Sequence, residues 1–250
     1  MARENPIPEK QIGDFVGKVQ QSAGTNLESI ILYGSAASGE YEADYSNINL
    51  LVVLKDTSFP SLIALAPVVE SWTQQRRPAP MLITRDELER SADVFSIELL
   101  DMKRQHRVLH GTDVVASLQI PMVLHRAQLE YELREKLILL RQNLLLAGND
   151  HGRVWELMLR SLPAFATLCR HAVIAQGEPV PATKRDAIEQ LAANLAIDAS
   201  PFLILLDIRE HRVDRGKFKV GELAGQYLAA VEKVTAAVDR MLDKPKIEGS

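Results

Sequence analysis

The chain has 250 residues, of which 46% are hydrophobic and 25% charged, and its net charge is −4. This composition suffices for one large domain or two modest ones. Because the chain has no surplus of basic residues, we do not expect nucleic acid as a partner. No apolar run approaches the ~20 residues of a membrane span. The single cysteine, Cys169, cannot form an internal disulfide, so we expect a cytoplasmic protein.

The first half of the sequence alternates helical and strand patterns. Apolar residues recur at helical spacing from about Pro8 to Ser22 and from Leu62 to about Gln75. Thr84 and Glu87 match a capping box, which predicts a helix start. Short apolar runs bounded by turn signals predict four strands, at residues 30–33, 48–54, 81–84 and 108–110. Such alternation predicts a mixed sheet flanked by helices.

From Pro121 onward the pattern is helical only. Five stretches show helical periodicity, at about residues 133–148, 155–177, 187–195, 201–212 and 223–238. Helices with short connections and no strand pattern predict a helical bundle. We therefore expect one domain over residues 1–115 and a helical bundle domain over residues 116–245.

The most informative stretch joins the first two predicted strands. It contains Gly34 and Ser35 directly after the first strand and Asn47 and Asn49 in the region of the second, with eleven residues between Ser35 and Asn47. Gly34 permits a tight turn. Asn47 and Asn49 are two residues apart, so on a strand their side chains project to the same face.

This stretch resembles the signature of the DNA polymerase beta-like nucleotidyltransferase superfamily, which includes kanamycin nucleotidyltransferase and the minimal nucleotidyltransferases. Its members carry Gly-Ser after the first strand and Asp-x-Asp or Asp-x-Glu about a dozen residues later. Here the sequence L-Y-G-S-A-A-S-G-E-Y fits, and S-N-I-N-L-L-V-V-L stands where such enzymes read S-D-I-D-L-L-V. The resemblance implies an α+β protein, with an N-terminal nucleotidyltransferase-like mixed sheet and flanking helices followed by a C-terminal helical bundle.

The resemblance also implies roles for individual residues. Gly34 and Ser35 would bind the phosphates of a nucleotide, as backbone N–H groups at such a turn can. Asn47 and Asn49 stand where two carboxylates would hold Mg²⁺, and Met81 matches the third acidic position. Asparagine supplies no charge, and magnesium sites rely on carboxylates. We therefore assign no catalytic residue, interpret Asn47, Asn49 and Met81 as vestigial metal positions, and expect no cofactor.

Other charged residues leave alternatives open. Asp44 could swing toward the second strand, and Glu98 and Asp101 share one face of a predicted helix. The basic run from Lys103 to His110 could line a phosphate or partner site. The more ordinary interpretation of each is a solvated loop or helix face.

Three hypotheses follow. The leading one is a catalytically degenerate nucleotidyltransferase, or pseudoenzyme, that binds a nucleoside triphosphate or a protein partner. The alternative is an active Mg²⁺-dependent enzyme that moves a nucleoside monophosphate onto a small molecule, protein or RNA end. The third is a scaffold that forms a homodimer through its helical bundle.

Overall fold

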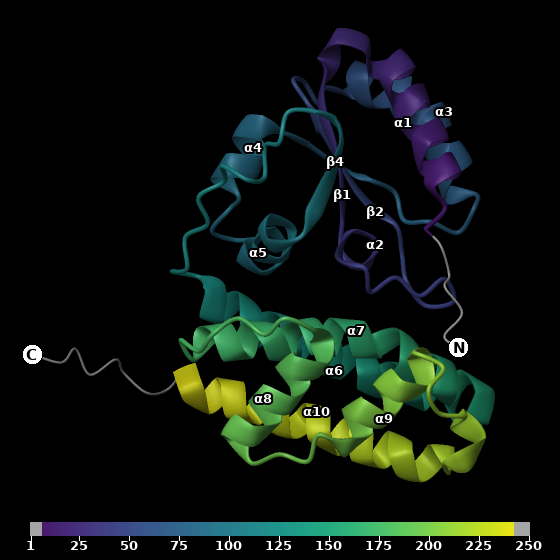
Figure 1. Cartoon of the computed structure of the whole chain (residues 1–250), viewed down its shortest axis with the longest axis vertical. Helices are drawn as coiled ribbons and strands as arrows, with labels where there is room; N and C mark the ends of the chain where they lie inside the picture. The colour runs from purple at the N-terminus through teal and green to yellow at the C-terminus, as the bar shows by residue number, and fades with distance from the viewer. Residues whose placement is uncertain (1–6, 243–250) are drawn as a thin grey trace, which may run out of the picture. The chain divides into compact units, whose positions relative to one another are not determined.

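The computed structural model describes residues 7–242, which divide into two compact units between Val123 and Leu124 (Figure 1). The first unit holds a four-stranded sheet with helices, and the second holds α6 to α10. The expected α+β class, with a mixed sheet followed by a helical bundle, is confirmed.

The sheet of the first unit has the strand order β3-β2-β1-β4. Strand β1 pairs antiparallel with both β2 and β4, whereas β2 and β3 run parallel. The four strands span Leu27–Tyr33 (β1), Asn49–Leu54 (β2), Met81–Thr84 (β3) and His106–Gly111 (β4). All four predicted strands are present, although β1 and β4 begin earlier than the sequence pattern indicated and β2 begins one residue later.

Both faces of this sheet are covered, because alternate residues of β1 and β2 enter two separate cores. On one face, Ile30 and Val52 pack with residues of α1 (Glu9–Ala23) and α3 (Phe59–Thr73). These two helices lie side by side in Figure 1. On the other face, Ile31 and Leu51 pack with residues of α4 (Arg85–Arg90), α5 (Ser96–Arg104) and the segment after β4. The two-residue period of a strand thus accounts for the unbroken apolar runs in the sequence.

The connections in this unit follow local sequence rules. The capping box predicted at the start of α4 is confirmed, since Thr84 and Glu87 bond each other's backbone N–H groups. The region from Asp86 to Gly111 holds two helices, α4 and α5, separated by a turn over residues 91–95. The one-turn helix α2 (Ser35–Ser38) follows β1, and the 3₁₀ turn η1 (Gly24–Asn26) precedes it.

The second unit is the predicted helical bundle. Helix α7 packs against α6, α8, α9 and α10. The core of this bundle includes Tyr227 of α10. The Tyr227 ring meets Phe165 and Phe202 edge-on, and its hydroxyl lies 3.1 Å from Ser161 Oγ. The elements span His125–Ala147 (α6), His151–Ala175 (α7), Lys184–Leu195 (α8), Ser200–Arg209 (α9), Arg215–Lys217 (η2) and Val220–Leu242 (α10).

Among the residues that the structure describes, no helix is both long and apolar enough to cross a membrane.

Candidate functional site

The turn after β1 has a backbone that only glycine adopts readily. Gly34 has φ 74° and ψ −154°, in a region closed to side chains with a Cβ. Its carbonyl accepts hydrogen bonds from the backbone N–H groups of Ala37 and Ser38 at 2.9 and 3.1 Å, which begins α2. The first N–H groups of a helix have no partner within the helix. The turn at Gly34 and Ser35 can therefore present backbone donors to an anion.

Asn49 lies against this turn. It is the direct cross-strand partner of Tyr33, the residue before Gly34. A Cβ on Gly34 would lie 2.9 Å from Asn49 Nδ2, closer than two such atoms can settle. Gly34 is thus required for its backbone conformation, and a side chain there would also displace the end of the Asn49 side chain.

Asn47 differs from the sequence prediction, because it lies before β2 rather than on it. Hydrogen bonds to the carbonyl of Glu42 hold residues 42–46 in a turn, and pairing with β1 starts only at Asn49. Burial still alternates here: Asn47 is exposed, Ile48 is buried, and Asn49 is half-buried. The side chains of Asn47 and Asn49 therefore face away from the core that holds Ile48.

Met81 projects from the same side of the sheet as Asn49. In the parallel pair, Met81 lies opposite Leu51, and opposed residues of neighbouring strands share a face. Leu51 and Asn49 are two residues apart on β2, so all three side chains share that face. Met81 is 37% exposed. The structure thus brings Asn49 and Met81 to one side of two adjacent strands, whereas Asn47 lies outside the strand that would fix its side.

These three residues do not fit a resident magnesium ion. They offer two neutral amide oxygens and a thioether, whereas Mg²⁺ prefers charged oxygen ligands in octahedral geometry. Within residues 7–242, no group of three or more histidine, cysteine, aspartate or glutamate side chains is arranged to hold a metal. These three side chains therefore support no reaction step that depends on a metal ion.

An acidic side chain approaches the same turn from α5. Burial raises the pKa of Tyr33, and the nearby negative charge of Glu98 raises it further. Glu98 is half-buried in the first turn of α5. Asp44, by contrast, is exposed in the turn before β2. In the sequence, the only local sign of Tyr33 is that an aromatic residue stands directly before Gly34.

The basic run at the end of α5 and along β4 is engaged within the first unit. Arg107 donates two hydrogen bonds to the Glu9 carboxylate, at 2.8 and 2.7 Å, and these lower the pKa of Glu9. His106 Nε2 lies 2.9 Å from both carboxylate oxygens of Asp113. Lys103 donates to a backbone carbonyl at 2.7 Å. These contacts favour a structural face over a phosphate site.

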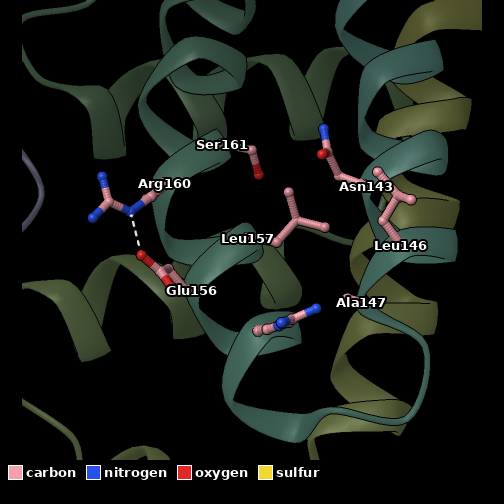
Figure 2. Close-up of a pocket in the computed structure, with 8 residues that line it drawn as sticks. Asn143, Leu146, Ala147, Glu156, Leu157, Arg160 and Ser161 are labelled. Atoms are coloured by element: carbon pink, nitrogen blue, oxygen red, sulfur yellow. Dashed lines mark hydrogen bonds and ion pairs between the residues drawn. The ribbon is translucent and has the colours of Figure 1, made fainter.

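A separate open groove lies within the helical unit, beside the α6–α7 connection, with a volume of about 450 Å³ (Figure 2). Leu146 and Leu157 line it, together with Arg160, which donates to Glu156 at 2.9 Å. Its walls combine leucines with Arg160, whose guanidinium is already bonded to Glu156. The groove's hydroxyl group, on Ser161, is already bonded to the Met158 carbonyl and the Tyr227 hydroxyl, and no cluster of acids lines the groove, so we place the candidate site at the Gly34 turn.

The comparisons with known proteins bear on the fold. No family model and no curated protein matches this chain. Among solved structures, spectinomycin adenyltransferase AAD(9) from Enterococcus faecialis, determined with ATP and spectinomycin, aligns over 90% of this chain and 99% of its own, with 16% identity and a TM-score of 0.54. The chain shares the fold of this adenyltransferase.

A second structure is described as a toxin-antitoxin with AMP-PNP. It aligns over 40% of this chain and 74% of its own, with 22% identity and a TM-score of 0.29, which is too low to indicate a shared fold.

Proposed function

We propose that this protein is a catalytically degenerate nucleotidyltransferase that binds a nucleoside triphosphate without a resident metal ion. One observation carries the proposal. Asn49 and Met81 project from the same side of β2 and β3, and Asn47 lies exposed just before β2, beside a Gly34–Ser35 turn whose first backbone N–H groups can serve as phosphate donors. The phosphate-binding half of the family pattern is present, and the metal-binding half is replaced by uncharged groups.

The charge of the site is consistent with phosphate binding and with the loss of metal binding. Compared with two aspartates, Asn47 and Asn49 remove two negative charges from the site. Metal affinity falls with that loss, because Mg²⁺ gives up its water reluctantly and needs charged ligands. A triphosphate meets less repulsion from two amides than from two carboxylates. The ATP in the structure of spectinomycin adenyltransferase AAD(9) supports a nucleotide as the ligand class.

An active Mg²⁺-dependent enzyme is the second candidate. The approach of Glu98 to Tyr33 favours it, since a carboxylate near the turn can contribute charge that Asn47 and Asn49 lack. In this version Glu98 supplies part of the metal site, and a nucleoside monophosphate passes to a small molecule, protein or RNA end.

Thermal melting with ATP, GTP, CTP and UTP separates the candidates, each nucleotide being tested with EDTA and with Mg²⁺. The proposal predicts a rise in melting temperature with at least one nucleotide in EDTA. The Ser35→Ala variant should lose part of that rise. Ser38→Ala is the matched control, because its hydroxyl donates back to the Ser35 carbonyl at 3.4 Å rather than to a ligand.

A rise that requires Mg²⁺ supports the active enzyme instead. No rise under any condition contradicts both nucleotide hypotheses and leaves the scaffold.

A further inference from the structure

Helix α3 is apolar on every side over most of its length. From Phe59 to Val69 it contains no charged residue. Its inner side, with Leu65 and Trp72, is buried against the sheet and α1. A helix that is hydrophobic all round is normally buried all round. The other side of α3 is nevertheless open to solvent.

We define the outer α3 face as the exposed apolar residues of this helix. Phe59 is 75% exposed, Ile63 52% and Leu62 37%. Four smaller exposed residues complete the face: Pro60, Ala64, Ala66 and Pro67. Exposed apolar residues that gather on one helix, rather than standing singly, are often functional surface.

We propose that the outer α3 face is a homodimer interface, covered by the same face of a second copy of this chain. With about 200 Å² for a phenylalanine side chain and proportionately less for the smaller ones, the face offers roughly 500 Å² per copy. Two copies then bury about 1,000 Å², the lower limit of a specific interface, which indicates a weak dimer. An uncharged apolar face is complementary to itself, as a two-fold interface requires.

The exposed charge at the C-terminal end of α3 disfavours a parallel arrangement of the two copies. Glu70 is exposed near the C-terminal end, and Lys55 is exposed just before the N-terminal end. At the N-terminal end, Asp56 already accepts hydrogen bonds from the Ser58 and Ser61 hydroxyls, at 2.5 Å each. Antiparallel packing separates the two Glu70 side chains and sets each of them near both Lys55 and Asp56 of the other copy, whose opposite charges offset each other. Parallel packing would instead set the two Glu70 side chains together.

This interface differs from the homodimer through the helical bundle that the sequence suggested. The bundle also exposes apolar residues on α6, among them Ile138, which is 53% exposed. Around it, Arg134 and Arg141 form ion pairs with acids of α10. A contact on that side would have to desolvate these pairs, whereas the outer α3 face carries no such cost.

Sedimentation equilibrium of the full chain tests the proposal, from about 1 to 200 µM to bracket a micromolar Kd. We expect a monomer–dimer equilibrium that Ile63→Glu weakens by at least about tenfold. Ile138→Glu is the matched control, because both residues are exposed to nearly the same degree on helices, and it should leave the equilibrium unchanged. A parent chain that stays monomeric overturns the proposal, as does dissociation by Ile138→Glu.

A cross-linking measurement tests the proposal even if the Ile63→Glu variant fails to fold. In an antiparallel pair that crosses near Ile63, cysteines at this position face each other across the two-fold axis, within reach of a disulfide. The native Cys169 is buried, which raises the pKa of its thiol to about 12 and leaves it unreactive. Mild oxidation should therefore convert Ile63→Cys, but not Ile138→Cys, to a covalent dimer. Equal cross-linking of the two variants refutes the α3 interface.

Discussion

Replacing Gly34 by alanine tests whether the turn after β1 organises the first unit. The backbone there, at φ 74° and ψ −154°, costs a residue with a Cβ about 1–3 kcal/mol. The new Cβ would also lie 2.9 Å from Asn49 Nδ2, so the Asn49 side chain must move. We expect Gly34→Ala to reduce the free energy of unfolding by about 2–4 kcal/mol.

Urea unfolding followed by circular dichroism measures this loss, and Gly39→Ala is its control. Gly39 also has a positive φ, 78°, but its ψ of 5° lies in the left-handed helical region, and nothing lies within 4 Å of its Cβ position. Its replacement should cost about 1–2 kcal/mol. Placing Gly34→Ala in an Asn49→Ala background removes the side-chain contact and should recover about 0.5–1 kcal/mol. Equal costs for Gly34→Ala and Gly39→Ala, or no recovery in that background, would refute the account of the turn.

Three further predictions concern other parts of the chain. Gly111→Ala should prevent the first unit from folding, since its Cβ would lie 1.9 Å from the Glu28 carbonyl oxygen; native-like circular dichroism would contradict this. Burial, and then the charge of His171, lowers the pKa of His125 from 6.5 to about 4. The unfolded chain therefore binds more protons between these values, and about 3 kcal/mol of stability should be lost as the pH falls from 6.5 to 4. Urea titrations should show this loss in the parent and a smaller one in His125→Gln. Calorimetric titration of the parent with Mg²⁺ alone should show no binding; micromolar binding that Asn47→Ala abolishes would disprove the loss of the metal site.

Local patterns predicted the existence and type of the elements better than their ends. Strand β3 matches its prediction because prolines precede a short apolar run. Strand β1 extends back to Leu27, past the polar Glu28 and Ser29, because Ser29 is buried and its hydroxyl donates to the backbone carbonyl of Thr112 at 2.7 Å. A distant partner in the fold satisfies that hydroxyl, and no local pattern shows it.

The candidate site was predictable to a similar degree. Spacing from Gly34 located Asn47 and Asn49, and the strand register places Met81 on the same side of the sheet as Asn49. The approach of Glu98 to the turn comes from the packing of α5 on the sheet, which no residue spacing encodes. The role of Asn47, Asn49 and Met81 in ligand binding remains a prediction.

The melting temperature of the Asn47→Asp/Asn49→Asp double variant, measured with and without Mn²⁺ beside the parent, tests the degenerate metal site most directly. The two carboxylates would lie two residues apart, one just before β2 and one at its first residue, and their repulsion should lower stability until a cation binds the folded state. We predict a metal-dependent rise confined to the variant. An equal response in both proteins would mean that Asn47 and Asn49 do not occupy a former metal site.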